Sequence, residues 1–252
     1  MKAIYSAALM MAVVALVAIG VPAYASKTDD RIESSAKKSY VFKTYLKDDD
    51  IKIESKNGVV TLTGTVTEEY HKSLAQETVA GLPGVKKVDN SLEVKGEHPA
   101  ESSDAWLSAK VKTTLLFHRS VSGLKTGVDV KDGIVILQGE ATSQAQKELA
   151  TEYAKDVEGV KDVKNEMTVA KTSKKTSRTA GEKIDDASIS AQVKMALLFH
   201  RSTSALNTTV ATKRGVVTLG GKAKNAAEKD LVTKFVDDVN GVKSVNNRMK
   251  IE

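Results

Sequence analysis

The stretch Asp132-Gly-Ile-Val-Ile-Leu-Gln-Gly139 decides the fold of this chain, because a version of it occurs three times. The earlier version is Asn57-Gly-Val-Val-Thr-Leu-Thr-Gly64, and the later one is Arg214-Gly-Val-Val-Thr-Leu-Gly-Gly221. A polar residue and a glycine followed by an apolar run are typical of a tight hairpin that enters a strand. We therefore predict three copies of one folded unit.

Further signals recur at a constant distance from each hairpin. In every copy a Gly-Val pair follows the second hairpin glycine at the same spacing, and an asparagine follows that pair at the same spacing. The glycine of the Gly-Val pair is expected at a helix C-terminus. The turn glycines predicted from these spacings are Gly58, Gly64, Gly84, Gly133, Gly139, Gly159, Gly215, Gly221 and Gly241.

Helical periodicity flanks the hairpins. Apolar residues at four-residue spacing precede the second and third hairpins: Leu107, Val111 and Leu115, and Ile189, Val193 and Leu197. After the second hairpin, Leu149, Tyr153 and Val157 predict a helix that buries these three side chains. The order helix, strand, strand, helix, strand predicts an α+β fold of three tandem two-layer α/β modules, each with a three-stranded mixed sheet under two helices.

The repeats define the domain boundaries. We expect repeat one at residues 30–96, repeat two at 103–170, a basic linker at 171–183 and repeat three at 184–252. Repeat one is divergent, because its first helix matches the sister helices only if five residues are deleted between Leu46 and Asp50. Each repeat is small and buries a modest core, yet is expected to fold alone.

Residues 1–25 have the pattern of a cleaved signal peptide. A positive start is followed by the apolar run Ala7 to Val21 and by Ala23-Tyr24-Ala25, so cleavage is expected before Ser26. The apolar run is short of the roughly 20 residues needed to cross a bilayer. We therefore predict a periplasmic protein with no transmembrane segment in the mature chain.

The composition excludes several kinds of site. The chain has no cysteine, which excludes disulfides, a thiolate metal site and a cysteine nucleophile, and its four histidines are scattered. No acid/base pair recurs in the three copies, so neither an enzyme nor a cofactor is expected. Nucleic-acid binding is disfavoured by the export signal and by an aromatic content of only 4%.

The repeated residues resemble the BON domain, named for bacterial osmotically inducible and nodulation proteins. The resemblance rests on Gly133 to Leu137, on Gly139, on Gly159-Val160 and on Asn165, all with counterparts in the other copies. It implies an α/β unit, a periplasmic location and no catalytic residues. It also implies attachment to phospholipid membranes or assistance to envelope proteins, often under osmotic stress.

The positive charge is concentrated in the C-terminal third. Residues 171–183 hold five basic residues and one acidic residue, and residues 184–252 hold eleven and seven. Basic residues near an anionic bilayer contribute on the order of 1 kcal/mol each. The linker cations Lys171, Lys174, Lys175 and Arg178 are therefore candidate contacts with an anionic surface, although a solubilising linker without a partner has the same composition.

Trp106 is the only tryptophan and lies next to the apolar stripe of its helix. Its counterparts are Ser188 and, with the five-residue deletion, Ala36, so we expect a partly exposed indole. Such a ring suits a bilayer interface or a protein partner. The alternative is an indole packed against its own module or a neighbouring repeat.

The motif Leu-Phe-His-Arg-Ser ends the first helix of repeats two and three, at residues 116–120 and 198–202. Cations at a helix C-terminus complement the helix dipole, which is one interpretation of the motif. The other is contact with an anion. The candidate residues are His118, Arg119, His200 and Arg201, extended by Lys110, Lys112 and Lys194.

These observations predict a non-catalytic envelope protein that binds anionic phospholipid membranes or envelope components. The alternative is a periplasmic chaperone or adaptor for outer-membrane or secreted client proteins. The sequence leaves the oligomeric state open.

Overall fold

The computed structural model describes residues 23–96, 103–121, 126–170, 183–203 and 208–252, and it contains three modules. Within these ranges, module 1 is residues 23–96, module 2 is residues 103–170 and module 3 is residues 183–252. Each has the predicted order of helices and strands, so the α+β class is confirmed. Residues 1–22 of the predicted signal peptide and residues 171–182 of the predicted linker lie outside the described residues.

The bounds of the elements show the repetition. Module 1 has α1 (Ala23–Lys38), α2 (Tyr40–Thr44), β1 (Asp50–Lys56), β2 (Val59–Val66), α3 (Glu69–Ala80) and β3 (Lys87–Val94). Module 2 has α4 (Asp104–Phe117), β4 (Thr126–Lys131), β5 (Ile134–Ala141), α5 (Gln144–Lys155), β6 (Asp162–Asn165) and β7 (Thr168–Val169). Module 3 has α6 (Asp186–Phe199), β8 (Thr208–Lys213), β9 (Val216–Ala223), α7 (Ala226–Asp237), β10 (Ser244–Asn247) and β11 (Lys250–Ile251).

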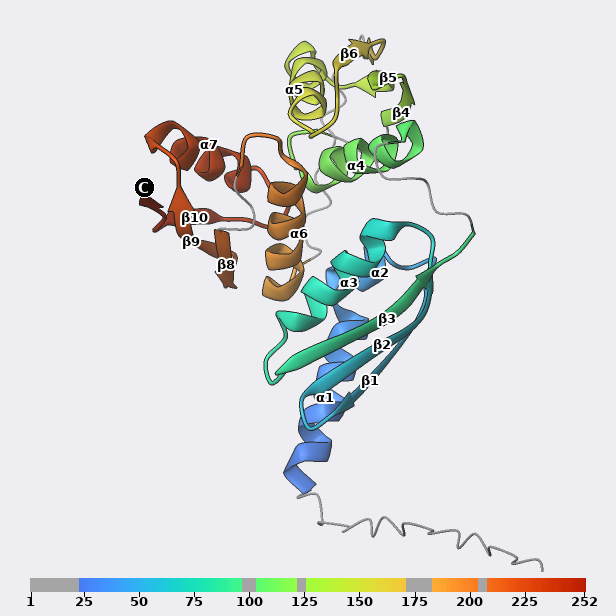
Figure 1. Cartoon of the computed structure of the whole chain (residues 1–252), viewed down its shortest axis with the longest axis vertical. Coiled ribbons are helices and arrows are strands. Elements are labelled where there is room, and N and C mark those ends of the chain that lie inside the picture. Colours follow the sequence, from blue (N-terminus) through green and yellow to red (C-terminus); the bar gives the residue numbers. More distant parts are fainter. Residues whose placement is uncertain (1–22, 97–102, 122–125, 171–182, 204–207) are drawn as a thin grey trace, which may run out of the picture.

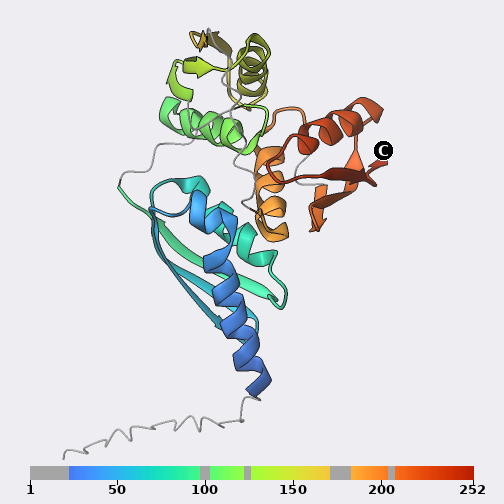
Figure 2. The same cartoon turned by 180° about the vertical axis from the view of Figure 1, so that it is seen from behind.

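Each module has a mixed sheet whose central strand follows the hairpin turn. In module 1, β1 pairs antiparallel with β2 and β3 pairs parallel with β2. In modules 2 and 3 the last strand is divided into two segments, and both pair parallel with the central strand. Figure 2 shows α1 and α3 on the same face of the module 1 sheet, which gives the predicted two layers.

The hairpin turns require backbone conformations that glycine favours. Asn57, Asp132 and Arg214 have φ of 53 to 55°, and the glycine after each has φ of 80°. Two consecutive positive φ angles match the right-handed twist of the flanking strands. At the second motif glycine of module 1, Gly64, a Cβ atom would lie 2.0 Å from the carbonyl oxygen of Asp50, so no side chain fits.

One aspartate of each first helix fixes the hairpin to that helix. The carboxylates of Asp29, Asp104 and Asp186 each accept hydrogen bonds from both backbone N–H groups of the turn, at 2.7 to 2.9 Å. The spacing between the aspartate and the turn glycine is the same in all three modules. The expected five-residue deletion in repeat one is therefore wrong. The counterpart of Trp106 in module 1 is Arg31, not Ala36.

The late asparagines connect the last strand to the second helix. In module 2 the Asn165 side chain donates to the carbonyl oxygen of Lys147 and to Thr151, and its Oδ1 accepts the N–H of Met167. Asn90 and Asn247 make the corresponding bonds in modules 1 and 3. This asparagine therefore has a structural role.

Two expectations about the second helix are corrected. Leu149 is 40% exposed, because α5 turns Ala150 and Ala154 rather than Leu149 toward the sheet. The glycines of the Gly-Val pairs lie beyond the helix ends, since α5 ends at Lys155 and Gly159 follows in the next turn. The chain makes one more turn before the last strand begins, and Val157 is buried in that turn.

The three modules meet around α6 (Figure 1). Eleven of its fourteen residues are buried, because α6 contacts α3 of module 1 and α4 of module 2 as well as its own sheet. Modules 1 and 3 share one continuous hydrophobic core, which Phe117 of module 2 joins, whereas the other buried apolar residues of module 2 form a separate core. The modules therefore form one packed assembly rather than three independent domains.

Candidate functional sites

The Leu-Phe-His-Arg-Ser motif joins modules 2 and 3 through contacts that occur twice. His118 of module 2 forms a β-bridge with Val239 of module 3, and His200 of module 3 forms one with Val157 of module 2. The two histidines are corresponding residues of the repeats, and so are the two valines. The modules therefore face each other through the same surface, as subunits do in a two-fold symmetric dimer. We call this surface the paired junction.

Backbone hydrogen bonds follow the same reciprocity. The N–H of Arg119 donates to the carbonyl oxygen of Asp238, and the N–H of Arg201 donates to that of Asp156, at 2.9 and 2.8 Å. The guanidinium groups also reach across the junction. Arg119 donates to the carbonyl oxygen of Val242, and Arg201 donates to the carbonyl oxygens of Val157 and Val160. These arginines hold backbone oxygens of the neighbouring module.

The two histidine rings lie inside the paired junction and not on an open surface. His118 has no exposed area, His200 is 4% exposed, and both rings pack against Phe235. His118 also stacks on Tyr153 with 4.0 Å between ring centroids. Neither histidine is available to an anion in solution, which corrects the anion-contact interpretation for these two rings.

Burial sets the charge of these histidines. Desolvation lowers the pKa of His118, and the nearby Asp238 carboxylate, 3.6 Å away, opposes this effect. Desolvation also lowers the pKa of His200, which Asp156 opposes from 3.7 Å. The N–H of Ser202 donates to Nδ1 of His200, which requires an unprotonated nitrogen there. Both rings are therefore neutral near pH 7.

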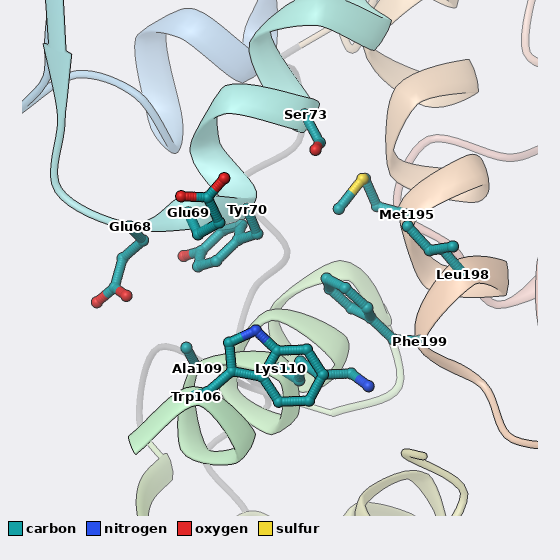
Figure 3. A pocket seen from close by; sticks show the side chains of 10 residues that line it. All are labelled: Glu68, Glu69, Tyr70, Ser73, Trp106, Ala109, Lys110, Met195, Leu198 and Phe199. Atoms are coloured by element: carbon teal, nitrogen blue, oxygen red, sulfur yellow. The ribbon is translucent and has the colours of Figure 1, made fainter. Parts of the chain in front are cut away.

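A cavity of about 440 Å³ lies where all three modules meet. Trp106 and Lys110 of α4 form one wall, and in Figure 3 the indole faces the space between Tyr70 and Phe199. The other lining side chains are Glu68, Glu69 and Ser73 of module 1, Ala109 of module 2, and Met195 and Leu198 of module 3. We call this space the junction cavity. Trp106 is half-buried in it, between its own module and its neighbours.

The predicted lysines do not form one surface. Lys110 is 6% exposed, with its ammonium 4.3 Å from the centre of the Trp106 ring. Lys194 forms an ion pair with Glu77 of module 1, and Lys112 is exposed on α4. The structure therefore places the three in different environments. Lys171, Lys174, Lys175 and Arg178 lie outside the described residues.

A second hollow, which we call the basic groove, lies at the start of α6. This open groove of about 890 Å³ is lined by Lys183, Arg214 and Lys243, all exposed, together with Arg119. Lys183, Arg214 and Lys243 form no ion pair within the part of the chain that the structure describes.

Two aspartates also line the basic groove, but their carboxylates are bound within the fold. Asp186 accepts from the hairpin turn, as described above. Asp185 caps α6 and accepts the N–H of Tyr40. Both carboxylates are therefore held by hydrogen bonds within the fold. Arg119 pairs with Asp237 and Asp238, so the groove cations available to an anion from outside are Lys183, Arg214 and Lys243.

Comparison with known proteins agrees with this repeated architecture. Residues 28–96, 103–171 and 185–252 each match the BON domain. The chain belongs to the BON domain family. Over 143 residues it is 32% identical to Osmotically-inducible protein Y of Escherichia coli (strain K12). The matched stretch covers 55% of this chain and 71% of that protein. The resemblance inferred from the sequence is thus confirmed.

Two further relatives match over shorter stretches. The Outer membrane lipoprotein DolP of Haemophilus influenzae is 34% identical over 125 residues, which is 46% of this chain and 64% of DolP. The 21 kDa hemolysin of Actinobacillus pleuropneumoniae is 31% identical over 116 residues, 45% of this chain and 59% of that protein. This chain spans less than two thirds of both proteins.

The BON modules contain contacts and hollows that reasoning from the sequence missed. The hairpin aspartates had a signal, their constant spacing from the turn glycine. The basic groove had a partial signal, because Arg214 replaces the asparagine or aspartate of the sister turns. The junction cavity had none, since its walls come from three modules.

No helix in the described residues is long and apolar enough to span a membrane.

Proposed function

We propose that this BON protein is a non-catalytic, periplasmic envelope protein that binds anionic phospholipid membranes through the basic end of module 3. The observation that carries the proposal is the basic groove, where three exposed cations have no ion-pair partner among the described residues. The names of two relatives, an osmotically inducible protein and an outer membrane lipoprotein, support an envelope setting with a role in osmotic or envelope stress.

The basic groove is specific to module 3. Its Arg214 stands where modules 1 and 2 have Asn57 and Asp132. In those modules the lysine after the Gly-Val pair, Lys86 or Lys161, donates to the carbonyl oxygen of the turn. The cations of the predicted linker, Lys171 to Arg178, precede Lys183 in the chain and add to the positive charge of this part of the sequence. Each adds on the order of 1 kcal/mol at an anionic surface.

Co-sedimentation of residues 26–252 with vesicles tests this function. We expect binding to vesicles of phosphatidylglycerol and phosphatidylcholine, none to phosphatidylcholine alone, and loss of binding as salt rises. The combined variant Lys183→Gln, Arg214→Asn, Lys243→Gln should lower the affinity at least tenfold. Asparagine is the residue that module 1 carries at the same turn, so the hairpin is retained.

A matched control removes three exposed cations elsewhere, by the combined change Lys52→Gln, Lys112→Gln, Lys222→Gln. It alters net charge equally and should lower affinity much less. Equal losses for both variants would show a charge effect without a site. If wild-type protein bound neither vesicle, the lipid function would be wrong, and suppression of client aggregation would be the next assay, for the chaperone or adaptor alternative.

A further inference from the structure

The junction cavity has the composition of a site for an apolar group. Trp106, Tyr70 and Phe199 present aromatic surface to it, and Met195 lies beside them (Figure 3). Leu198 is 46% exposed, the most exposed leucine among the described residues, and lies at this cavity. Its volume of about 440 Å³ falls within the roughly 300–1,000 Å³ of small-molecule pockets.

Lys110 adds one cation to these apolar walls. Only 6% of its surface is exposed, and the hydrogen bond that its ammonium makes is to the backbone oxygen of Glu158 at 3.2 Å. It forms no ion pair within the described ranges. Desolvation lowers the pKa of this ammonium, and the charge of Glu158 opposes the shift. A buried cation without a carboxylate partner is costly unless an anion joins it.

The cation is a feature of module 2 alone. The corresponding positions are Ser35 in module 1 and Gln192 in module 3, both uncharged. Gln192 is buried and donates to the carbonyl oxygen of Ser188 in its own helix. The fold therefore does not need a lysine at this helix position.

The acidic residues at the cavity do not neutralise Lys110. Glu68 and Glu69 are exposed, and Figure 3 shows both carboxylates directed away from Trp106 and Phe199. Glu69 pairs with Lys72 at 3.3 Å. An anionic group beside the indole would thus meet the ammonium and not these carboxylates.

We propose that the junction cavity binds a single-chain anionic amphiphile, such as a fatty acid. Its alkyl chain packs against Trp106, Phe199 and Met195, and its carboxylate lies beside Lys110. This site is separate from the basic groove and does not depend on the proposed membrane attachment. Because the walls come from three modules, a bound chain also stabilises their arrangement.

Fluorescence of Trp106 tests the proposal, because it is the only tryptophan of the chain. The protein of residues 26–252 is titrated with sodium decanoate and with decanol, both below the concentration at which they aggregate. We expect a saturable change in emission, with decanoate bound at least tenfold more tightly than decanol. Equal affinity for the two ligands, or no saturable change, would overturn the proposal.

Three variants locate the ligand. Lys110→Met and Lys110→Gln should lower the affinity for decanoate to that for decanol, and the second carries the residue found in module 3. Ser73→Leu fills the cavity from an exposed position on α3 and should lower the affinity for both decanoate and decanol. Decanoate preference retained in both Lys110 variants, or unchanged binding in Ser73→Leu, would contradict the site.

The groove variant separates this site from the proposed function. The combined variant Lys183→Gln, Arg214→Asn, Lys243→Gln should keep the decanoate response while losing vesicle binding. Loss of both together would show that decanoate binds at the basic groove. Displacement of decanoate by an uncharged apolar peptide, at the affinity of decanol or better, would instead identify the cavity as a polypeptide site and overturn the proposal.

Discussion

Module 3 meets its two neighbours in different ways. With module 2 it forms the paired junction, where the β-bridges and the backbone hydrogen bonds of each module are repeated by the corresponding residues of the other. Single side-chain contacts to Asp237 and Asp238 add to these. With module 1 it packs α6 against α3, and the polar contacts are single. Asp185 accepts the N–H of Tyr40, Ser188 accepts the N–H of Val41, and Tyr45 donates to Gln192.

The difference follows from the sequence at one place in the repeat. The counterpart of Leu-Phe-His-Arg-Ser in module 1 is Val41-Phe-Lys-Thr-Tyr45, which lacks the histidine and the arginine. A surface pairs with itself only when both copies carry the same groups. Module 1 therefore cannot take the place of module 2, and the divergence of repeat one determines where it binds.

The largest loss of stability is expected for a substitution at the centre of the paired junction. Phe235→Ala removes the ring that contacts both His118 and His200, and it leaves a cavity under a 5% exposed side chain. Such changes cost about 3–5 kcal/mol. We expect a loss of this size in the free energy of unfolding, measured by urea denaturation at pH 7.5.

The matched control lies at the junction with module 1. Tyr45→Phe removes one hydroxyl, which donates to Gln192 at 3.2 Å, and should cost about 1 kcal/mol. A loss for Phe235→Ala no larger than that for Tyr45→Phe would contradict the ranking of the two junctions.

Acidification should open the paired junction at a higher pH than the junction between modules 1 and 3. His118 and His200 have lowered pKa values in the paired state because of burial, and separation returns them toward the ordinary value of about 6.5. The separated state then binds more protons as pH falls below about 6.5, so the stability of the pairing is present above that pH and declines below it.

The carboxylate of Asp238, which faces His118, stays ionised as the pH falls toward 5. Burial raises the pKa of Asp238, but contacts from His118, Ser120 and Tyr153 outweigh it and lower the pKa to about 2. The pairing is therefore not lost through protonation of Asp238 between pH 7 and 5. The histidines are the groups whose titration changes it.

Amide hydrogen exchange measures the two junctions in one experiment. The N–H groups of Arg119 and Arg201 cross the paired junction, and those of Tyr40 and Val41 cross the other. Between pH 7 and 5, corrected for intrinsic rates, we expect protection to fall for the first pair and to hold for the second. The double variant His118→Phe, His200→Phe should abolish the difference. An equal fall at both junctions would show general acid destabilisation.

The module was predictable from the sequence because its signals are local. Hairpin glycines, Gly-Val turns and helical periodicity all act within one repeat, and the structure reproduces them three times. The incorrect register of the first helix in repeat one follows from aligning apolar residues alone. The aspartate of the hairpin, Asp29, fixes the register through hydrogen bonds and has the same spacing from its turn as the sister aspartates.

The surfaces between modules were not predictable in the same way. A serine at position 188 predicts an exposed site, yet Ser188 has no exposed area because Val41 of module 1 covers it. His118 and His200 have the pattern of helix-terminal cations, but a neighbouring module buries them. Periodicity within one module reports which face meets its own sheet, and it carries no information about a second partner.

The smallest effect is expected at the ion pair between Lys194 and Glu77, which links modules 3 and 1. Both side chains are part-exposed, at 37% and 29%, so solvent and salt screen their attraction. Lys194→Gln and Glu77→Gln, combined in a double-mutant cycle, should give a coupling of less than about 1 kcal/mol that declines at high salt. The paired junction has an ionic contact of Arg119 with Asp237 and Asp238, but it also relies on backbone bonds and on rings that are neutral at pH 7. Its exchange protection should therefore decline less with salt than this coupling does. A coupling well above that limit, and unchanged by salt, would mean that this pair anchors module 1 as firmly as the reciprocal contacts anchor module 2.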